Sequence, residues 1–211
     1  MKLKKASTIF GLSFFILTLI SCKEEKLPTI DVKSNEVQFY AVGEYNSSNL
    51  KIEAGVNNYF MNSNYYLNGR LFVLKSTLEQ TNCTECPNSL EISISNFQIN
   101  SSVTAFNIDT IFYPGKVFPL FFDSLLSPIN KPNLAVINVK DPLAYKYYSQ
   151  VYYQPSNFLR IKKVESYPEL NHLGQKTVKV SFQSNCFLKN DSLGTLDTLS
   201  LHGVFAFAYP N

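Results

Sequence analysis

Residues 90–97 read Leu90-Glu-Ile-Ser-Ile-Ser-Asn-Phe97, and this stretch decides the fold class. Its first five residues alternate strictly between apolar and polar side chains. Alternation of this kind is typical of a β-strand that places one face on a core and the other in water. The segment therefore predicts a half-buried strand.

Segments of similar character recur on both sides of it. They cover residues 37–42, 50–54, 57–68, 70–79, 134–139, 145–153, 158–164, 177–182 and 199–209. Asn, Ser, Gly and Pro lie between them, and these residues favour turns. Strands at about ten-residue spacing with turn chemistry between them favour a sandwich. We expect an all-β fold, an antiparallel β-sandwich of the Ig-like kind.

Prolines suggest a division of the chain into two modules. Pro114, Pro119, Pro128 and Pro132 interrupt the strand pattern, and the boundary is expected near residues 126–133. The sequence Gln-[Ser/Thr]-Asn-Cys-x₅-Ser-Leu also occurs twice, beginning at Gln80 and at Gln183. We predict β-sandwich modules at 34–127 and 128–211. A single sandwich spanning both halves is the alternative.

The N-terminus has the layout of a cleaved export signal. Lys2, Lys4 and Lys5 precede an apolar run from about residue 9 to residue 20, and that run is shorter than the roughly 20 residues of a comfortable membrane span. We predict a signal peptide at 1–21 and a tether at 22–33. The alternatives are a signal with an incidental cysteine and an N-terminal membrane helix.

The end of this segment, Leu19-Ile20-Ser21-Cys22, resembles the bacterial lipobox. By that resemblance Cys22 is diacylated on sulfur, released by cleavage after Ser21 and then N-acylated. Several acyl chains on one residue make stable membrane anchoring. The run Lys23-Glu-Glu that follows is similar to the export signal of surface lipoproteins in the Bacteroidota, although any charged tether would look the same. The resemblance implies an outer-membrane lipoprotein exposed at the cell surface.

Charge excludes one class of partner once the signal is removed. The chain has 19 Lys and Arg residues against 16 Asp and Glu, and three of the lysines belong to the signal. The mature chain is therefore formally neutral. It has no overall basic character to indicate nucleic-acid binding.

Cys83 and Cys86 form the most chemical-looking motif, Cys-Thr-Glu-Cys-Pro. Redox enzymes place such a pair at a helix N-terminus, where the thiol pKa is lowered. Here Asn, Thr and Pro flank the pair between two predicted strands. A disulfide that closes a turn is therefore favoured over a redox site. No second cysteine pair with a histidine partner indicates a metal site, and the position of Cys186 leaves the connectivity open.

Other catalytic signatures are weak. His172 and His202 are the two histidines, and no Ser or Cys nucleophile motif or Gly-rich phosphate loop accompanies them. No cofactor is indicated. Carboxylate pairs of the kind that hydrolyse glycosides carry no local sequence signature, so an unmarked hydrolase stays open.

Four sites read Asp-[Ser/Thr]-aliphatic, with hydroxyls on Thr110, Ser124, Ser192 and Thr198. The pattern resembles the O-glycosylation sequon of exported Bacteroidota proteins. Used sites would have to be exposed. An Asp/Ser turn that enters a strand gives the same pattern.

Tyrosines gather at Tyr59–Tyr66 and at 145–153. In a strand, Tyr145 and Tyr147 share one face. Together with Tyr152 they are candidate binding aromatics for a glycan or a protein, because Tyr combines a flat apolar face with a hydroxyl. The alternative is that they cover a core.

These features predict a lipid-anchored surface protein that acts as a non-catalytic binding or structural module. Its partner would be a glycan, a protein or an envelope complex. A thiol-redox enzyme using Cys83 and Cys86, an unmarked hydrolase and an accessory subunit of a nutrient-uptake system are the alternatives.

Overall fold

The computed structural model describes residues 38–68, 71–80, 89–96, 107–120, 133–141, 145–150, 157–190 and 193–210. These residues are nearly all in strands, with one short 3-10 turn, η1 (Ile108–Thr110). The strands are β1 (Tyr40–Tyr45), β2 (Ser48–Glu53), β3 (Tyr59–Asn68), β4 (Leu71–Gln80), β5 (Ser89–Asn96), β6 (Val117–Pro119), β7 (Leu134–Lys140), β8 (Lys146–Gln150), β9 (Phe158–Tyr167), β10 (Lys176–Asn190) and β11 (Leu196–Tyr209).

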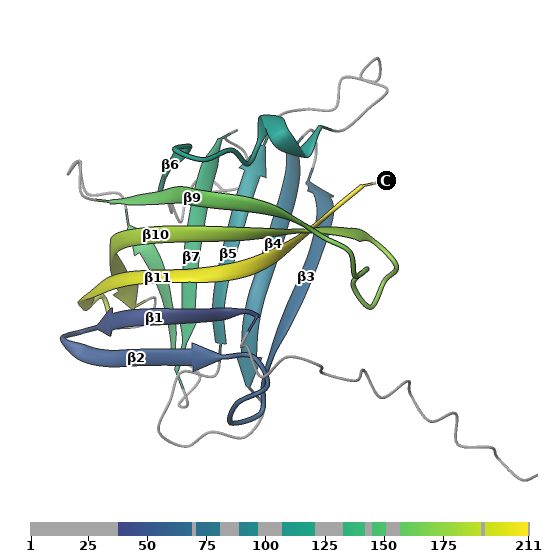
Figure 1. The fold of residues 1–211 in the computed structure, drawn as a ribbon. Coiled ribbons are helices and arrows are strands. Elements are labelled where there is room, and N and C mark those ends of the chain that lie inside the picture. The colour runs from purple at the N-terminus through teal and green to yellow at the C-terminus, as the bar shows by residue number, and fades with distance from the viewer. Residues whose placement is uncertain are drawn as a thin grey trace, which may run out of the picture. The chain divides into compact units, whose positions relative to one another are not determined.

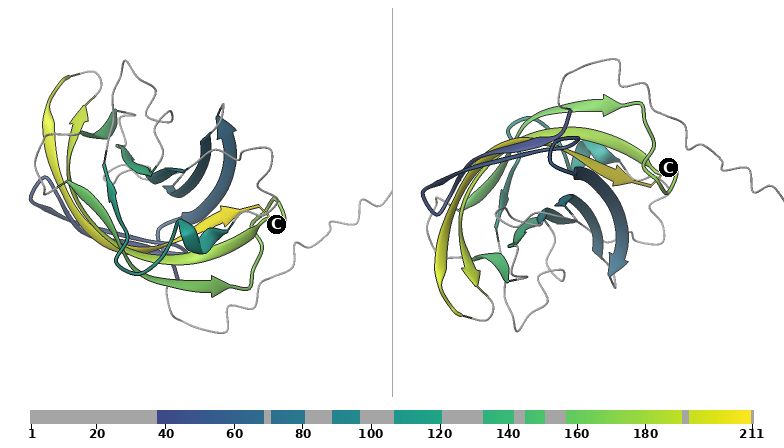
Figure 2. Two further views of the ribbon diagram at one scale, coloured as in Figure 1. Left: turned by 90° about the horizontal axis from the view of Figure 1, so that it is seen from above. Right: turned by 90° about the horizontal axis from the view of Figure 1, so that it is seen from below.

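The eleven described strands belong to one sheet, and each pair of neighbouring strands is antiparallel. Its main path runs β2-β1-β11-β10-β8-β7-β5-β4-β3, while β9 pairs with β10 and β6 with β9. The sheet curls so that β2, β1, β11, β10, β9 and β6 form one layer and β3, β4, β5, β7 and β8 form the other (Figure 1). We call these the front layer and the back layer. Figure 2 shows the curl from above and below.

Strand β10 makes the corner between the layers. One edge of β10 pairs with β11 along nearly its whole length. Its other edge pairs first with β9, over Thr177–Asn185, and then with β8, over Phe187–Asn190. The register with β9 shifts between Ser181 and Phe182, which marks a β-bulge or irregularity. Bulges increase local twist, so this position favours the bending of a long strand.

The alternating segment around Leu90 forms β5 as predicted. Leu90, Ile92 and Ile94 are fully buried, whereas Glu91 and Ser93 between them are partly exposed. Antiparallel pairing to β4 on one side and β7 on the other places β5 in the middle of the back layer. Its buried face contributes to the core between the layers.

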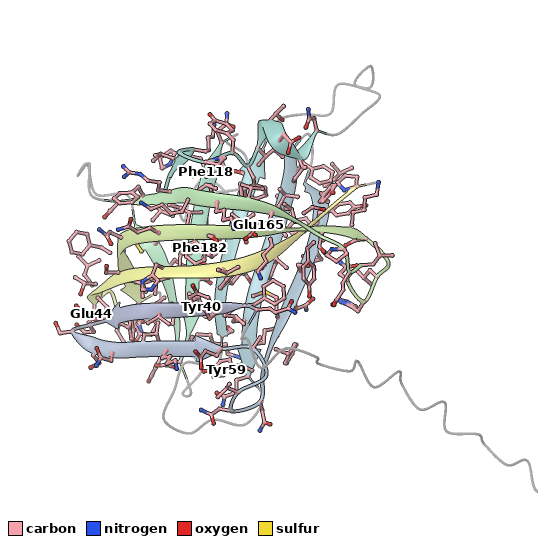
Figure 3. All side chains as sticks on the ribbon, in the orientation of Figure 1. Tyr40, Glu44, Tyr59, Phe118, Glu165 and Phe182 are labelled. Atoms are coloured by element: carbon pink, nitrogen blue, oxygen red, sulfur yellow. The ribbon has the colours of Figure 1, made fainter. Side chains whose placement is uncertain are left out.

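The core is rich in phenylalanine. Phe112, Phe205 and Phe207 are fully buried, and so is Phe118, while Phe182 is 2% exposed. Phe118 and Phe182 are labelled in Figure 3. The rings of Phe182 and Phe205 meet edge to face with centroids 5.2 Å apart. Burying such a side chain stabilises the fold by about 1.5–3 kcal/mol.

The all-β, antiparallel prediction is confirmed, but the two-module Ig-like sandwich is not. Strands from both sides of residue 127 pair directly, β5 with β7 and β1 with β11. The two copies of the repeat also lie in different settings. Gln80 ends β4, whereas Gln183 lies in the middle of β10.

Candidate functional site

The outer side of the back layer is a mostly polar surface. In β3, β4, β5, β7 and β8 the side chains at alternate positions point away from the core, because successive residues of a strand face opposite sides. We call this surface the polar face. Its residues are Phe60, Asn62, Asn64, Tyr66, Val73, Lys75, Thr77, Glu79, Ser89, Glu91, Ser93, Ser95, Leu134, Val136, Asn138, Lys140, Lys146 and Tyr148. Four of them, Val73, Thr77, Ser95 and Val136, are buried.

One row of residues crosses five strands of this face. Asn62 on β3 lies opposite Thr77, Thr77 opposite Glu91, Glu91 opposite Asn138, and Asn138 opposite Tyr148 on β8. We call these five residues the central row. Strands lie about 4.8 Å apart, so the row spans roughly 19 Å. That length suits an extended ligand better than a small one.

Glu91 is the hub of the row. Its carboxylate accepts hydrogen bonds from Asn138 Nδ2 at 3.0 Å and from Ser93 Oγ at 3.1 Å. The other carboxylate oxygen forms an ion pair with Lys75 Nζ. Charge-assisted contacts of this kind are stronger than neutral hydrogen bonds. Three partners therefore hold the carboxylate in place: Lys75 on β4, Asn138 on β7 and Ser93 on β5, the strand of Glu91 itself.

Three asparagines on this face have an unused acceptor. The Oδ1 atoms of Asn62, Asn64 and Asn138 are shielded from solvent and accept no hydrogen bond from the described part of the chain. The residues themselves are only partly buried. Asn62 Nδ2 donates to Glu79 Oε1 at 3.4 Å, a long contact. An unpaired buried acceptor costs about 1–3 kcal/mol, so these amides carry hydrogen-bonding capacity that the fold does not use.

The face is hollowed at one end. A groove of about 300 Å³ is lined by Lys75, Ser89, Glu91, Asn138, Val139, Lys140, Lys146 and Tyr148. Lys140 and Lys146 lie directly opposite each other on β7 and β8, and Lys189 of β10 lies opposite Tyr148. Each of the three is exposed. The ion pairs of the described residues involve Lys51, Lys75 and Lys163, so these three ammonium groups have no carboxylate partner there.

We call Lys140, Lys146 and Lys189 the basic end. Like charges directly across two strands are destabilising, since neither ammonium group gains a partner. A sheet that carries Lys140 opposite Lys146 therefore gives up a little stability at this point. An anion placed between them would remove that repulsion.

Aromatic side chains lie at the opposite edge of the face, on β3. Phe60 is 45% exposed and Tyr66 is 39% exposed. Partial burial raises the pKa of the Tyr66 hydroxyl, while the nearby Lys75 acts in the opposite direction. Flat, partly exposed rings beside a polar row are suited to packing against the apolar face of a ligand.

A second depression lies on the front layer. It measures about 470 Å³ and is lined by Gly43, Glu44, Lys162, Phe182, Gln183, Ser200, Leu201 and His202. Glu44 on β1 and Phe182 on β10 are labelled in Figure 3. A hydrogen bond from Ser200 Oγ to Asn185 Oδ1 at 2.8 Å satisfies the hydroxyl there. None of the unpaired buried atoms of the described residues lies in this depression. The polar face is therefore the stronger candidate site.

No protein-family model, curated protein or solved structure matches this chain. The site must therefore be interpreted from its own geometry. Within the described residues, no three His, Cys, Asp or Glu side chains gather as a metal site would require. No helix in the same residues is long and apolar enough to cross a membrane.

The predicted binding tyrosines have different settings. Tyr147 is half-buried against the core, and its ring meets that of Tyr45 edge to face at 6.0 Å. Tyr145 is 37% exposed, and its backbone N–H donates to Asp141 Oδ1. Tyr152 lies outside the described residues. The tyrosine that lines the groove is instead Tyr148, which lies on the opposite side of β8 from Tyr147.

The other residues predicted as sites also differ in exposure, and some lie outside the described residues. Thr110 is exposed, and its hydroxyl donates to the carbonyl of Asn107, while Thr198 is exposed on β11. Cys186 is buried with a free thiol. Both histidines are exposed, on β11 and in the turn between β9 and β10. Outside the described residues lie Cys22, Cys83, Cys86, Ser124 and Ser192.

Sequence reasoning missed Asn62, Asn64, Glu91 and Asn138. A signal for part of this set exists in β3, where Asn62, Asn64 and Tyr66 alternate with Met61, Ser63 and Tyr65. The alternation shows that the three share a face, but it does not show which other strands complete that face. Strand pairing supplies that information.

Proposed function

We propose that this protein is a surface-exposed outer-membrane lipoprotein, anchored through Cys22, whose folded unit is a non-catalytic binding module. The polar face is its binding site. The lipobox Leu19-Ile20-Ser21-Cys22 and the charged run behind it support the anchor and the address. The polar face has the chemistry of a ligand-binding surface.

One observation carries the binding site, the three unused asparagine acceptors on a single sheet face. Polar groups that serve only the fold are normally paired, because an unpaired one costs stability. Here two of them lie on β3 and one on β7, on the same face of the sheet, and Asn138 lines the groove. A ligand that donates hydrogen bonds would satisfy them together.

The arrangement favours binding over catalysis. A catalytic carboxylate must be able to give or take a proton at the substrate. Both oxygens of Glu91 are instead engaged, by Lys75 on one side and by Asn138 and Ser93 on the other. Its role on this face is to orient its neighbours.

Binding is tested by hydrogen exchange on the mature chain. The probes are neutral oligosaccharides, uronic-acid oligosaccharides and short acidic and neutral peptides. We expect at least one probe to slow exchange in β4, β5 and β7. Asn138→Ala should abolish that protection. Asn185→Ala is the matched control, since Asn185 lies on the outer side of the front layer, and it should leave protection intact. Protection confined to other strands, or equal loss in both variants, would show that the polar face is not the site.

The same incubations test whether the module is catalytic. Products are separated by mass spectrometry after prolonged incubation with each oligosaccharide probe. Intact probe is expected throughout. Shorter oligosaccharides that disappear in Glu91→Gln would establish a hydrolase and overturn the non-catalytic assignment.

The anchor is tested in the cells that make the protein. An alkyne-labelled fatty acid should label the wild-type chain and leave Cys22→Ala unlabelled. Protease added to intact cells should remove the folded unit. An unlabelled wild type would contradict the anchor, and survival of the protein on intact cells would contradict surface exposure.

A further inference from the structure

We propose that the ligand of the polar face is an acidic oligosaccharide, with its hydroxyls along the central row and a carboxylate at the basic end. This inference rests on the proposed binding function and deepens it. It follows from three independent features of the face: the acceptor surplus, the unpaired lysines and the pairing of the strands beneath.

The acceptor surplus specifies a ligand rich in donors. Asn62, Asn64 and Asn138 each have an unused Oδ1, while Asn138 Nδ2 is already committed to Glu91. Rotation about the Cβ–Cγ bond of an asparagine has a broad energy profile, so the amides of Asn62 and Asn64 can turn toward solvent at small cost, whereas Asn138 would give up its hydrogen bond to Glu91. A sugar hydroxyl donates one hydrogen bond and accepts others. Successive hydroxyls along a sugar chain therefore fit acceptors that are spread across the face, from Asn62 and Asn64 on β3 to Asn138 on β7.

The basic end specifies an anion at one position only. Lys140 on β7 lies opposite Lys146 on β8, and Lys189 on β10 lies opposite Tyr148 on β8. Elsewhere on the face the charge is balanced locally, since Lys75 pairs with Glu91. A ligand with charge along its whole length would meet the carboxylates of Glu79 and Glu91. A chain with few carboxylates, one of them at this end, matches the pattern.

The strands beneath the face argue against an extended peptide. A peptide that binds a sheet by strand addition needs an edge with unpaired backbone groups. Strands β4, β5, β7 and β8 each have neighbours on both sides, so they offer side chains only. Strand β3 ends the sheet path, but a peptide added to its edge would run along β3 and not along the central row. The groove at the basic end is also lined mainly by polar and charged residues, with Val139 and Tyr148 as its less polar members. It has no deep apolar pocket for a peptide side chain.

Tyr148 and the β3 aromatics complete the match. Tyr148 ends the central row inside the groove, and Phe60 and Tyr66 lie on β3 at its other end. Aromatic rings provide flat apolar faces, and the axial C–H groups of a sugar ring are apolar as well. The two ends of the row can therefore each hold a sugar ring, with the amides between them.

The test is isothermal titration of the full mature chain with three matched sets of probes. They are tetrasaccharides of mannuronate or galacturonate with a single free carboxylate (the others methyl-esterified), the neutral mannose and galactose tetrasaccharides, and a tetrapeptide with one glutamate. We expect at least one mono-acidic tetrasaccharide to bind at least about tenfold more tightly than its neutral counterpart. The peptide should show no binding.

Variants assign the two parts of the site. The double variant Lys140→Gln, Lys146→Gln should remove the preference for the acidic sugar, so that the acidic and neutral sugars bind alike. Lys140→Arg, Lys146→Arg should restore it, which a merely structural role would not predict. Asn138→Ala should weaken both sugars. The control Lys162→Gln, on the front layer, should change neither.

Each other outcome contradicts a definite part of the inference. Equal binding of acidic and neutral sugars would overturn the role of the basic end. Binding of the peptide but of no sugar would overturn the ligand class and leave the proposed binding function standing. If no probe binds and none protects the polar face in hydrogen exchange, both proposals fail together.

Discussion

Replacing Glu91 by Gln tests whether the polar face is organised by its central carboxylate. The substitution keeps the shape of the side chain and removes its charge. The ion pair with Lys75 is lost, and the hydrogen bonds from Asn138 and Ser93 lose their charge assistance. The side chains of Lys75 and Glu91 are 35% and 19% exposed. This ion pair is therefore more shielded than a surface pair worth about 0.2–1 kcal/mol, yet it is not fully buried.

We expect Glu91→Gln to lower the free energy of unfolding by about 1.5 kcal/mol. The figure lies between the surface value and the roughly 3–5 kcal/mol of a broken buried pair. For a folded unit of this size, it corresponds to a fall in Tm of about 3–6 °C. Unfolding in urea, followed by far-UV circular dichroism and by tyrosine fluorescence, measures the change directly, since the chain has no tryptophan.

Two comparisons make this result interpretable. Glu53 pairs with Lys51, whose side chain is 65% exposed, so Glu53→Gln should cost less than about 0.5 kcal/mol. A double-mutant cycle of Glu91→Gln with Lys75→Met should give a coupling energy of about 1 kcal/mol. If Glu91→Gln costs no more than Glu53→Gln, or if the coupling is zero, then Glu91 does not organise the face.

Three further predictions concern the fold itself. A Cβ on Gly203 would lie 2.2 Å from the carbonyl oxygen of Tyr40, so Gly203→Ala should destabilise the fold by about 3 kcal/mol. Gly194→Ala should cost only the strain of its left-handed backbone, about 1–2 kcal/mol. Equal losses of stability in urea unfolding would contradict the close approach of β1 and β11. Burial raises the pKa of Tyr59 and of Tyr167 to about 12. Because the folded state then holds these protons after the unfolded state has lost them, the free energy of unfolding should fall as the pH rises from about 10 to 12. Tyr167→Phe should make this fall with pH less steep, and an unchanged pH dependence would contradict the prediction. Burial also raises the pKa of the Cys186 thiol. Iodoacetamide at pH 8 should therefore leave Cys186 unmodified in the native protein and modify it in urea, which peptide mass spectrometry measures. Rapid labelling of the native protein would contradict the burial of Cys186.

Local pattern was sufficient to predict most of the strands, but it missed β6 and the second half of β10. The alternation of Leu90, Ile92 and Ile94 with polar residues is a property of a single segment, and the buried face of β5 follows from it directly. The end of the chain shows where the local pattern loses its meaning. Val204, Ala206 and Ala208 lie on the outer side of β11 and are nevertheless buried, so this segment reads as a continuous apolar run. Phe39 and Tyr167, whose rings meet at 5.3 Å, lie on that side of the sheet, and Tyr167 contacts the chain near Gln38.

The modular organisation was not predictable in the same way. Prolines 114 to 132 interrupt the pattern and suggest a boundary, but a sheet can pair strands across any such interruption. Strand β5 pairs with β7 across it, and β1 pairs with β11 from the other end of the chain. The energy that selects these partners comes from burying both layers against one core, to which Ile92 and Phe205 both belong. A single segment carries no record of its partner.

The binding face depends on the same long-range pairing, and Tyr147 and Tyr148 show why. Both are tyrosines, so hydropathy cannot tell which of them faces the core. A shift of one residue in register would exchange their roles along the whole of β8. Ser149 helps to fix the register, because its buried hydroxyl accepts the backbone N–H of Ile137 at 3.1 Å. That contact accompanies the pairing of Tyr148 with Asn138 and so completes the central row.

The long-range strand pairing that sequence patterns could not predict also makes the polar face suited to binding. Asn62, Glu91 and Asn138 come from strands far apart in the chain, yet β5 and β7 are paired on both sides and β3 is paired with β4 along its whole length. The backbone beneath the central row therefore need not become ordered when a ligand arrives. The conformational entropy lost on binding then comes mainly from side chains. Glu91 already restrains two of these side chains, Asn138 and Lys75. A face prepared in this way can hold a weakly interacting, heavily hydrated ligand such as a sugar chain with modest contacts at each residue.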